Sequence, residues 1–452
     1  MRRFPFALVF AASITAWLGS VPTASAQSAP ATQPQAARWY KGAIHDHSFW
    51  SDGHDFPEMV ALHYRDKGFN FLCLTDHDVI ADADRWFDVD EAVKRAEADD
   101  VLDVYTKQWG ADWVETREKD GKKQVRLKKF PEFAPRVEKP GEFILIRSEE
   151  ITDKIDKLPL HMNAYNLRHA VKPQHGDTTH DALRRNLRAV AEEEQASGGP
   201  IVVQINHPSF RWGVAAEDLV DVPEAAFVEV ANGGVGKAVL GDELHAGDER
   251  VWDIANTLRL AEHGERPLYG TASDDSHAYY GKPQTGSLHG WIMVRAAMLE
   301  PTALLTAMQA GDFYASTGIM LSDVHYAPAT GEYTVVVAPA ADAEYTIEFV
   351  GTPVKFDHHS EAVKDKDGQE VHATRRYSAD VGKVFETVKG MRVTNGHASG
   401  ESTVRATYKL TGDELYVRAR VTSNQPAANP AYKDQLQQAW TQPVGWEKHV
   451  RR

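Results

Sequence analysis

Short apolar runs alternate with amphipathic segments along the first three quarters of the chain. Six runs have strand character, at residues 39–44, 69–74, 143–146, 200–205, 227–230 and 267–271. Residues 181–196 and 251–263 instead place apolar side chains at helical spacing, and a glycine follows each segment. Another helix is expected after Asp55, with Pro57 in its first turn and Gly68 at its end. Strands that alternate with amphipathic helices indicate a parallel sheet.

The pattern changes after about residue 325. Strand-like runs follow one another without helices at residues 332–337, 345–350, 403–410 and 415–421. The last run alternates with period two, which is typical of a half-buried antiparallel strand. We therefore predict an α/β domain over residues 39–325 and a small β-sandwich-like domain over residues 326–452.

Residues 105–140 interrupt the α/β pattern. They include a run of charged residues, Glu115 to Lys123. Such a run is typical of a solvated surface insertion, although it could also form a wall over a site.

The first 26 residues have the pattern of a signal peptide. Arg2 and Arg3 precede a mostly apolar stretch, and Ala24-Ser25-Ala26 forms a cleavage site before Gln27. We predict export to a bacterial periplasm or the extracellular space. Residues 27–38 are rich in Ala, Pro, Gln and Ser and are expected to form a flexible leader.

Composition excludes several classes of function. The formal net charge of −15 argues against nucleic-acid binding, which demands a basic surface. The single cysteine, Cys73, excludes an intrachain disulfide framework, a Cys-based zinc site and a dithiol redox pair. Beyond the signal peptide, no stretch approaches the length of a membrane helix, so we expect no membrane insertion. The expected partner is a small-molecule substrate, and the oligomeric state is not predicted.

Candidate metal ligands follow the ends of the predicted strands. His45 and His47 stand two apart in an extended segment, so their imidazoles project to the same side. The full set contains six histidines and three carboxylates: His45, His47, Asp52, His77, Glu150, His161, His207, Asp275 and His277. Each alone could be an ordinary turn residue. As an ordered set they predict a metal cluster, with Zn, Mn or Fe favoured over Ca or Mg.

These motifs resemble the PHP (polymerase and histidinol phosphatase) family. The resemblance spans about residues 39–325 and lies in His45-Asp46-His47 with Ser51-Asp52-Gly53, Thr75-Asp76-His77-Asp78, Glu149-Glu150-Ile151-Thr152, His161-Met162-Asn163-Ala164-Tyr165, Asn206-His207-Pro208 and Ser273-Asp274-Asp275-Ser276-His277. It implies a distorted (β/α)7 barrel that holds two to three divalent metal ions. The signal peptide, the motif Gly311-Asp312-Phe313-Tyr314-Ala315-Ser316-Thr317-Gly318 and the trailing β-region are similar to the exported carbaryl-hydrolase-like (CehA/McbA-like) branch.

The resemblance also implies a division of the ligands. One metal would take His45, His47, Glu150 and Asp275, a second would share Glu150 and take His161 and His207, and a third would take Asp52, His77 and His277. Glu149 competes with Glu150, which is favoured because the family's glutamate precedes an apolar residue and then Ser or Thr. Asp274 competes with Asp275, which the Asp-x-His spacing selects.

The expected function is metal-dependent hydrolysis of ester bonds. A metal-bridging hydroxide would attack, so no protein nucleophile is required. Asp76, Asp78 and Asp274 could orient imidazoles or move protons, or could simply cap turns. Arg211 and Trp212 are candidates for substrate binding. A phosphoesterase is the leading hypothesis, and the alternatives are a carboxylic or carbamate ester hydrolase and a non-catalytic periplasmic metal-binding protein.

Overall fold

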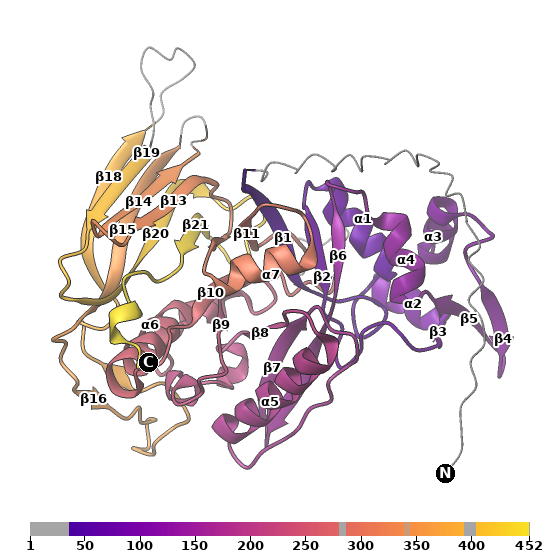
Figure 1. Ribbon diagram of the computed structural model, residues 1–452. Coiled ribbons are helices and arrows are strands. Elements are labelled where there is room, and N and C mark those ends of the chain that lie inside the picture. Colours follow the sequence, from indigo (N-terminus) through magenta and orange to yellow (C-terminus); the bar gives the residue numbers. More distant parts are fainter. Residues whose placement is uncertain (1–35, 280–285, 339, 341–342, 393–403, 452) are drawn as a thin grey trace, which may run out of the picture. The chain divides into compact units, whose positions relative to one another are not determined.

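The computed structural model describes residues 36–279, 286–338, 340, 343–392 and 404–451 (Figure 1). The predicted signal peptide and most of the predicted leader lie outside the described residues. Residues Ala36–Arg452 form one compact unit. Among the described residues, helices are either too short or too polar to cross a membrane.

The strands that carry the candidate ligands form the first part of a mixed sheet. Parallel pairing joins β1 to β2 and β2 to β6. β7 then runs antiparallel to both β6 and β8, and parallel pairing continues from β8 through β9 to β10. The bounds are β1 (Arg38–Asp46), β2 (Phe71–Leu74), β6 (Ile144–Ile155), β7 (Leu158–Tyr165), β8 (Val202–Ile205), β9 (Phe227–Asn232) and β10 (Tyr269–Ser273).

This fold is mixed α/β, and hydrogen bonds between the described residues do not close these strands into a barrel. The reason lies at β1, because β11 (Trp291–Ala296) pairs antiparallel with its first half, from Arg38 to Gly42. The chain after β10 reaches β1 only at its carboxyl end. There Ser276 bridges Asp46, and the His47 N–H donates to the Ser276 carbonyl oxygen at 2.9 Å.

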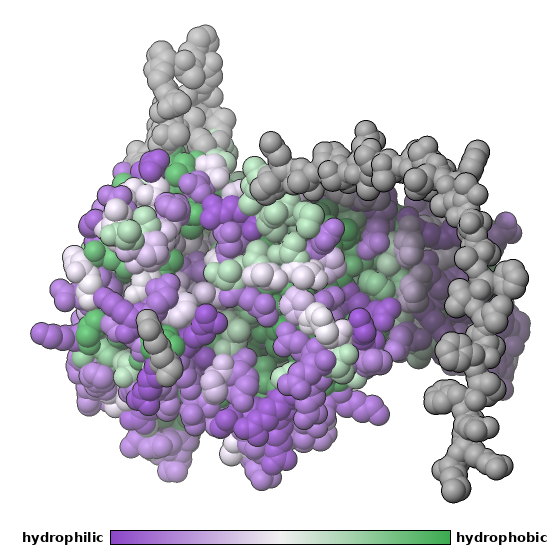
Figure 2. Space-filling view, in the orientation of Figure 1, coloured by the Kyte–Doolittle hydropathy of each residue, from purple (hydrophilic) through white to green (hydrophobic). Residues whose placement is uncertain are grey.

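Helices pack apolar faces against the sheet. In α5 (Thr179–Ser197) Leu183, Leu187 and Val190 are buried, while hydrophilic side chains cover its outer face (Figure 2). The Thr178 hydroxyl accepts a hydrogen bond from the Asp181 N–H and caps the start of this helix. The expected helix over 251–263 is α6 (Asp248–Leu258) followed by a π-helical turn over Arg259–His263. The remaining helices of this part are α1 (Pro57–Asp66) and α7 (Pro301–Gln309).

The insertion between β2 and β6 has a core-facing side as well as a solvated one. Its charge run forms the exposed hairpin of β4 (Thr116–Lys119) and β5 (Lys122–Leu127), which pairs with β3 (Arg85–Asp88). Helices α2 (Val89–Ala96), α3 (Val101–Trp109) and α4 (Phe130–Val137) surround it. Buried Glu58 of α1 anchors the insertion by accepting hydrogen bonds from the Tyr105 hydroxyl at 2.5 Å and the Trp113 indole at 2.9 Å.

The C-terminal strands continue the main sheet. It runs from β11 through β12 (Phe313–Ser316) to β21 (Leu436–Thr441), β20 (Glu414–Pro426), β15 (Glu344–Pro353) and β18 (Lys383–Arg392). A second sheet contains β13 (Leu321–Ala327), β14 (Glu332–Val337) and β19 (Val404–Lys409). Short strands β16 (Ser360–Glu361) and β17 (Arg376–Tyr377) form a separate ladder. In the described residues after 325, regular structure consists of strands apart from a 3-10 turn at Glu447–His449, as the sequence pattern predicts.

A buried ion pair joins β20 to α6. The Arg418 guanidinium donates to both carboxylate oxygens of Asp253, at 2.9 Å and 2.6 Å, and to Glu249 at 2.8 Å. It also lies over the Trp252 ring, 4.6 Å from the centroid. Arg418 is 1% exposed, so these partners replace its water.

We predict that Arg418→Met lowers the free energy of unfolding by about 3–5 kcal/mol, because Asp253 would keep a buried charge without its partner. Urea unfolding followed by circular dichroism measures the change. The same substitution at Arg185, which pairs with Asp181 on the exposed face of α5, should change stability little. Equal effects of the two substitutions would contradict a structural role for the buried pair.

Candidate metal centre

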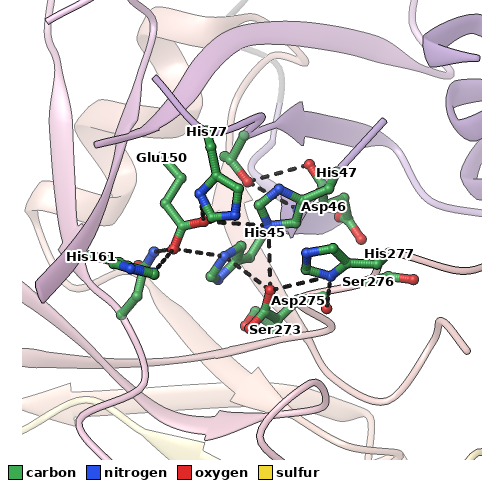
Figure 3. A network of polar contacts seen from close by, with 12 residues as sticks. His45, Asp46, His47, His77, Glu150, His161, Ser273, Asp275, Ser276 and His277 are labelled. Carbon is green, nitrogen blue, oxygen red and sulfur yellow. Dashed lines mark hydrogen bonds and ion pairs between the residues drawn. The ribbon is translucent and has the colours of Figure 1, made fainter. Parts of the chain in front are cut away.

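The nine candidate ligands converge in one cluster, of which Figure 3 labels His45, His47, His77, Glu150, His161, Asp275 and His277. β1 supplies His45, and the loop after it supplies His47 and Asp52. His77 follows β2, His207 follows β8, and Asp275 and His277 follow β10. Glu150 and His161 lie within the β6–β7 hairpin, where both side chains face the same cluster.

Glu150 is the centre of this arrangement. Its Oε1 lies 3.3 Å from His45 Nε2, 3.1 Å from His161 Nδ1 and 3.4 Å from His207 Nε2. Its Oε2 lies 3.4 Å from His47 Nε2 and 3.0 Å from His77 Nδ1. Asp275 forms a second focus, because its Oδ1 lies 3.3 Å from the Nε2 atoms of both His45 and His47.

The donor atoms fit a divalent cation. Three of them, His45 Nε2, His47 Nε2 and Glu150 Oε2, are buried and have no hydrogen-bond partner. Burying such atoms without a partner costs free energy, so a partner is expected. A tetrahedral ion with bonds of about 2.0–2.1 Å sets its ligands about 3.3–3.4 Å apart, which matches the separations around Glu150 and Asp275. Nitrogen and carboxylate oxygen donors together suit Zn, Mn or Fe.

The three ligand groups of the sequence-based division overlap in space. His47 directs Nε2 to Glu150 and Asp275, whereas its Nδ1 lies 3.6 Å from Asp52. His77 likewise directs Nε2 toward Asp52 at 3.6 Å and Nδ1 toward Glu150. The donors within reach of one another are His47, Asp52, His77 and His277; His45, His47 and Glu150; His45, His207 and Asp275; and His77, Glu150 and His161.

Exposure is uneven across the cluster. His45, His47 and Glu150 are at most 1% exposed. Asp52 is 53% exposed, His277 31% and His77 25%. The Asp52 carboxylate lies 3.2 Å from His277 Nε2. The cluster therefore has a closed interior and an accessible edge formed by Asp52, His77 and His277.

Sequence reasoning missed Glu229, the residue that holds His45. Glu229 Oε1 lies 2.8 Å from His45 Nδ1 and accepts a hydrogen bond from Gln204 at 2.9 Å. Its Oε2 accepts from the His207 N–H and from Asn232, both at 2.8 Å. Fixing Nδ1 in this way leaves Nε2 of His45 free to face the cluster. The available signal was a lone carboxylate in the otherwise apolar run Phe227-Val228-Glu229-Val230.

His77 has a comparable support. The Thr152 hydroxyl donates to the Glu150 carbonyl oxygen at 3.1 Å and lies 2.6 Å from His77 Nδ1. Because the Thr152 hydroxyl already donates its own proton to the Glu150 carbonyl oxygen, it must accept a hydrogen bond from His77. The imidazole proton of His77 is therefore on Nδ1. Nε2 of His77 is then left as a ligand atom on the side of Asp52.

The cluster balances its buried charges internally. Burial lowers the pKa of His45, but Asp275, Glu229 and Glu150 outweigh this effect and raise it well above the usual value. Burial raises the pKa of Glu150 and of Asp275, yet the surrounding imidazoles, His45 first, bring both well below the usual value. Burial and the nearby His277 lower the pKa of His47 to about 4, which keeps this ligand neutral. Cations therefore compete with protons for the cluster.

The three outer aspartates accept hydrogen bonds from backbone N–H groups and hydroxyls, including that of Tyr64, which donates to Asp274 at 2.5 Å. Asp76 accepts from the Ser48 N–H at 2.8 Å and from the hydroxyls of Ser48 and Ser51, both at 2.6 Å. Asp78 accepts from the Thr152 N–H at 2.9 Å. Asp274 accepts from three consecutive backbone N–H groups, those of residues 288–290, at 2.6–2.9 Å. These contacts fit the turn-capping alternative and position the loops that bear the ligands.

The two candidate substrate residues differ in their contacts. The Arg211 guanidinium is exposed over the Phe210 ring, whose centroid lies 5.2 Å from that of His207 and 6.1 Å from that of His161. Arg211 therefore contacts a ring that packs against two of the candidate ligands. Trp212 instead stacks on His245, with ring centroids 4.2 Å apart.

Three solved structures are similar to this chain. A two-domain protein from Bacteroides vulgatus that contains a predicted PHP-like metal-dependent phosphoesterase is 14% identical, over 92% of this chain and 100% of that one, with a TM-score of 0.36. A predicted metal-dependent phosphoesterase from Bifidobacterium adolescentis is 17% identical, over 54% and 90%, with a TM-score of 0.29. An amidohydrolase from Chromobacterium violaceum with bound sulfate and no metal is 14% identical, over 52% and 87%, with a TM-score of 0.27.

No protein-family model and no curated protein matches the sequence. At such low identities and TM-scores, the similar structures add no argument about activity. The clustered donor atoms of the nine candidate ligands are what indicates a function.

We predict that Glu229→Gln weakens metal binding by about 10–100-fold, because His45 Nδ1 would lose its charged partner. Competition between the protein and a coloured chelator for Zn²⁺ measures the affinity. Glu386→Gln, at an exposed position of β18, is the matched control and should bind as the wild type does. Unchanged affinity in a folded Glu229→Gln variant would contradict the positioning role.

Proposed function

We propose that this protein is a metal-dependent hydrolase that acts on phosphoesters. The observation that carries the proposal is the set of three buried, unpartnered donor atoms around Glu150, at separations that suit a tetrahedral cation. When bound, divalent cations supply Lewis acidity and lower the pKa of a coordinated water. The cations would be held by the nine clustered residues.

The chain's own residues support such a reaction without a protein nucleophile. Glu229 fixes the orientation of His45, and Thr152 fixes that of His77. Glu150 and Asp275 stay ionised, because the surrounding imidazoles bring the pKa of each well below its usual value. Cys73 cannot serve as a nucleophile, because burial raises the pKa of its thiol.

The accessible edge favours an enzyme over a non-catalytic metal-binding protein. Structural metal sites are closed by their protein ligands, whereas catalytic sites keep a position open to water or substrate. Asp52, His77 and His277 are partly exposed, so a substrate can reach the cluster from their side. This observation argues against the non-catalytic alternative.

Phosphoesters are favoured as substrates because several cations together suit a multiply charged oxyanion. The exposed Arg211 guanidinium lies over the Phe210 ring, which packs beside His161 and His207, and its positive charge would attract an anionic substrate. A carboxylic or carbamate ester hydrolase at the same site is the second candidate, and the resemblance to the carbaryl-hydrolase-like branch favours it.

Further parts of the proposal rest on the sequence. They are the arrangement of β1, β2 and β6 to β10 as a distorted (β/α)7 barrel, membership of the exported carbaryl-hydrolase-like branch, and export after cleavage near Ala26. The division into domains at residues 39–325 and 326–452 also stays a prediction.

We predict that His207→Ala lowers metal-dependent hydrolysis by more than about a hundredfold, since loss of a ligand should exceed loss of a supporting residue. The assay compares a phosphomonoester, a phosphodiester and an aryl carbamate, using protein of measured metal content. Folding should survive, as checked by circular dichroism. His175→Ala is the control, because His175 is largely exposed beside Asp153.

Two outcomes would contradict this reading. If the metal-loaded wild-type protein hydrolyses none of the three substrates, the proposal that it is a hydrolase is refuted. Full activity and full metal content in His207→Ala would refute the ligand assignment.

A further inference from the structure

A cavity of about 380 Å³ adjoins the accessible edge of the metal centre. Its volume is in the range of small-molecule pockets. One wall comes from the loop after Asp52, another from the chain after His277, and the third from the α2–α3 segment of the insertion. The lining residues are His54, Asp55, Arg95, Ala96, Glu97, Ala98, Asp100, Val101, Val104, Ala278 and Tyr279.

The cavity's position is tied to the ligands by short contacts. The His54 N–H donates to the His277 carbonyl oxygen at 2.8 Å. The Tyr279 hydroxyl donates to the carbonyl oxygen of His47 at 2.5 Å. Along the sequence, His54 follows Asp52 by two residues and Ala278 directly follows His277. Asp52 and His277 are the two most exposed candidate ligands. A molecule whose reacting group lies at the accessible edge can therefore extend into this cavity.

The far wall is apolar. Val101 is buried at the start of α3, and Val104, one turn later, is 45% exposed. Ala98 lies in the connection between α2 and α3, opposite the buried Ala278. Exposed valines are common, but here an exposed valine lines a concave surface beside a reactive cluster, which is the usual make-up of a ligand site.

Polar side chains line part of the cavity as well, among them His54, Glu97 and Asp100. The Arg95 guanidinium is held in place, because it donates to Glu91 at 3.0 Å and to the Ser51 carbonyl oxygen at 2.5 Å. This second bond fixes α2 to the loop that carries Asp52. The cavity is therefore a built feature of the insertion: the α2–α3 segment carries its apolar side chains, and Arg95 ties that segment to the loop that bears Asp52.

We propose that this cavity binds the apolar alkyl or aryl part of the ester whose reacting group is held at the metal centre. The inference rests on the proposed function for the position of the reacting group. It assigns a role to one part of the insertion between β2 and β6. This part, the α2–α3 segment over residues 89–109, selects substrates by their apolar part. Burial of an apolar group there adds affinity in proportion to the area removed from water.

The test compares the binding of phenylphosphonate and methylphosphonate, which share one charged group and differ in the apolar part. Calorimetry on the metal-loaded protein should show phenylphosphonate binding about tenfold or more tightly, as expected for a buried phenyl ring. Val104→Asp should remove this preference, and Ala98→Trp, which fills the cavity, should do the same. Val354→Asp is the matched control, because Val354 has a similar exposure of 40% far along the chain, and it should keep the preference.

Metal content should be equal in all four proteins, since none of these substitutions changes a donor atom. Equal binding of the two phosphonates by the wild type, or no binding of either, would overturn the inference. A preference that survives in both cavity variants would overturn it as well. Turnover of phenyl phosphate, measured on the same samples, tests the proposed function separately. If the protein prefers phenylphosphonate but turns over no phenyl phosphate, the proposal of a hydrolase is refuted and the assignment of the cavity stands.

Discussion

The carboxylate of Glu150 is 1% exposed and has five imidazole nitrogens within 3.4 Å. An isolated charge at this depth would be prohibitively costly, so the surrounding strands must deliver compensating groups to one point. Parallel pairing of β1, β2 and β6 does so by placing their carboxyl ends together. The arrangement of ligands is in this sense a consequence of charge burial combined with strand direction.

The β6–β7 hairpin imposes the tightest geometric condition. Thr152 lies opposite His161 and Glu150 opposite Asn163, so both strands direct functional side chains to one face. The Asn206 amide links them, donating to Glu150 at 2.8 Å and to Asn163 at 2.9 Å. A slip of one residue in this pairing would turn His161 to the other face, away from Glu150. The buried amide network therefore fixes a register that the apolar pattern alone leaves open.

Sequence reasoning located the strands that end at the ligands, because apolar runs followed by His, Asp or Glu are local signals. It did not foresee β7 as an antiparallel strand, since residues 158–165 mix polar and apolar side chains to suit the cluster rather than a simple pattern. Glu229 escaped notice because its partners come from β1 and β8, far away in the chain. The insertion at residues 105–140 was expected to be mostly solvated, whereas Tyr105 and Phe133 are buried in the core. Long-range partners cannot be read from periodicity.

The pairing of β12 with β21 has a consequence for the order of folding. Tyr314 lies opposite Thr441, and β21 then carries β20 and the rest of the C-terminal strands. β1 depends in a similar way on β11, where Arg38 lies opposite Ala296. Contacts of such long separation form slowly, because the loop must close before they contribute. The main sheet thus cannot be completed until β21 has been synthesised, which leaves a long interval in which the polypeptide is incompletely folded and accessible to proteases and chaperones.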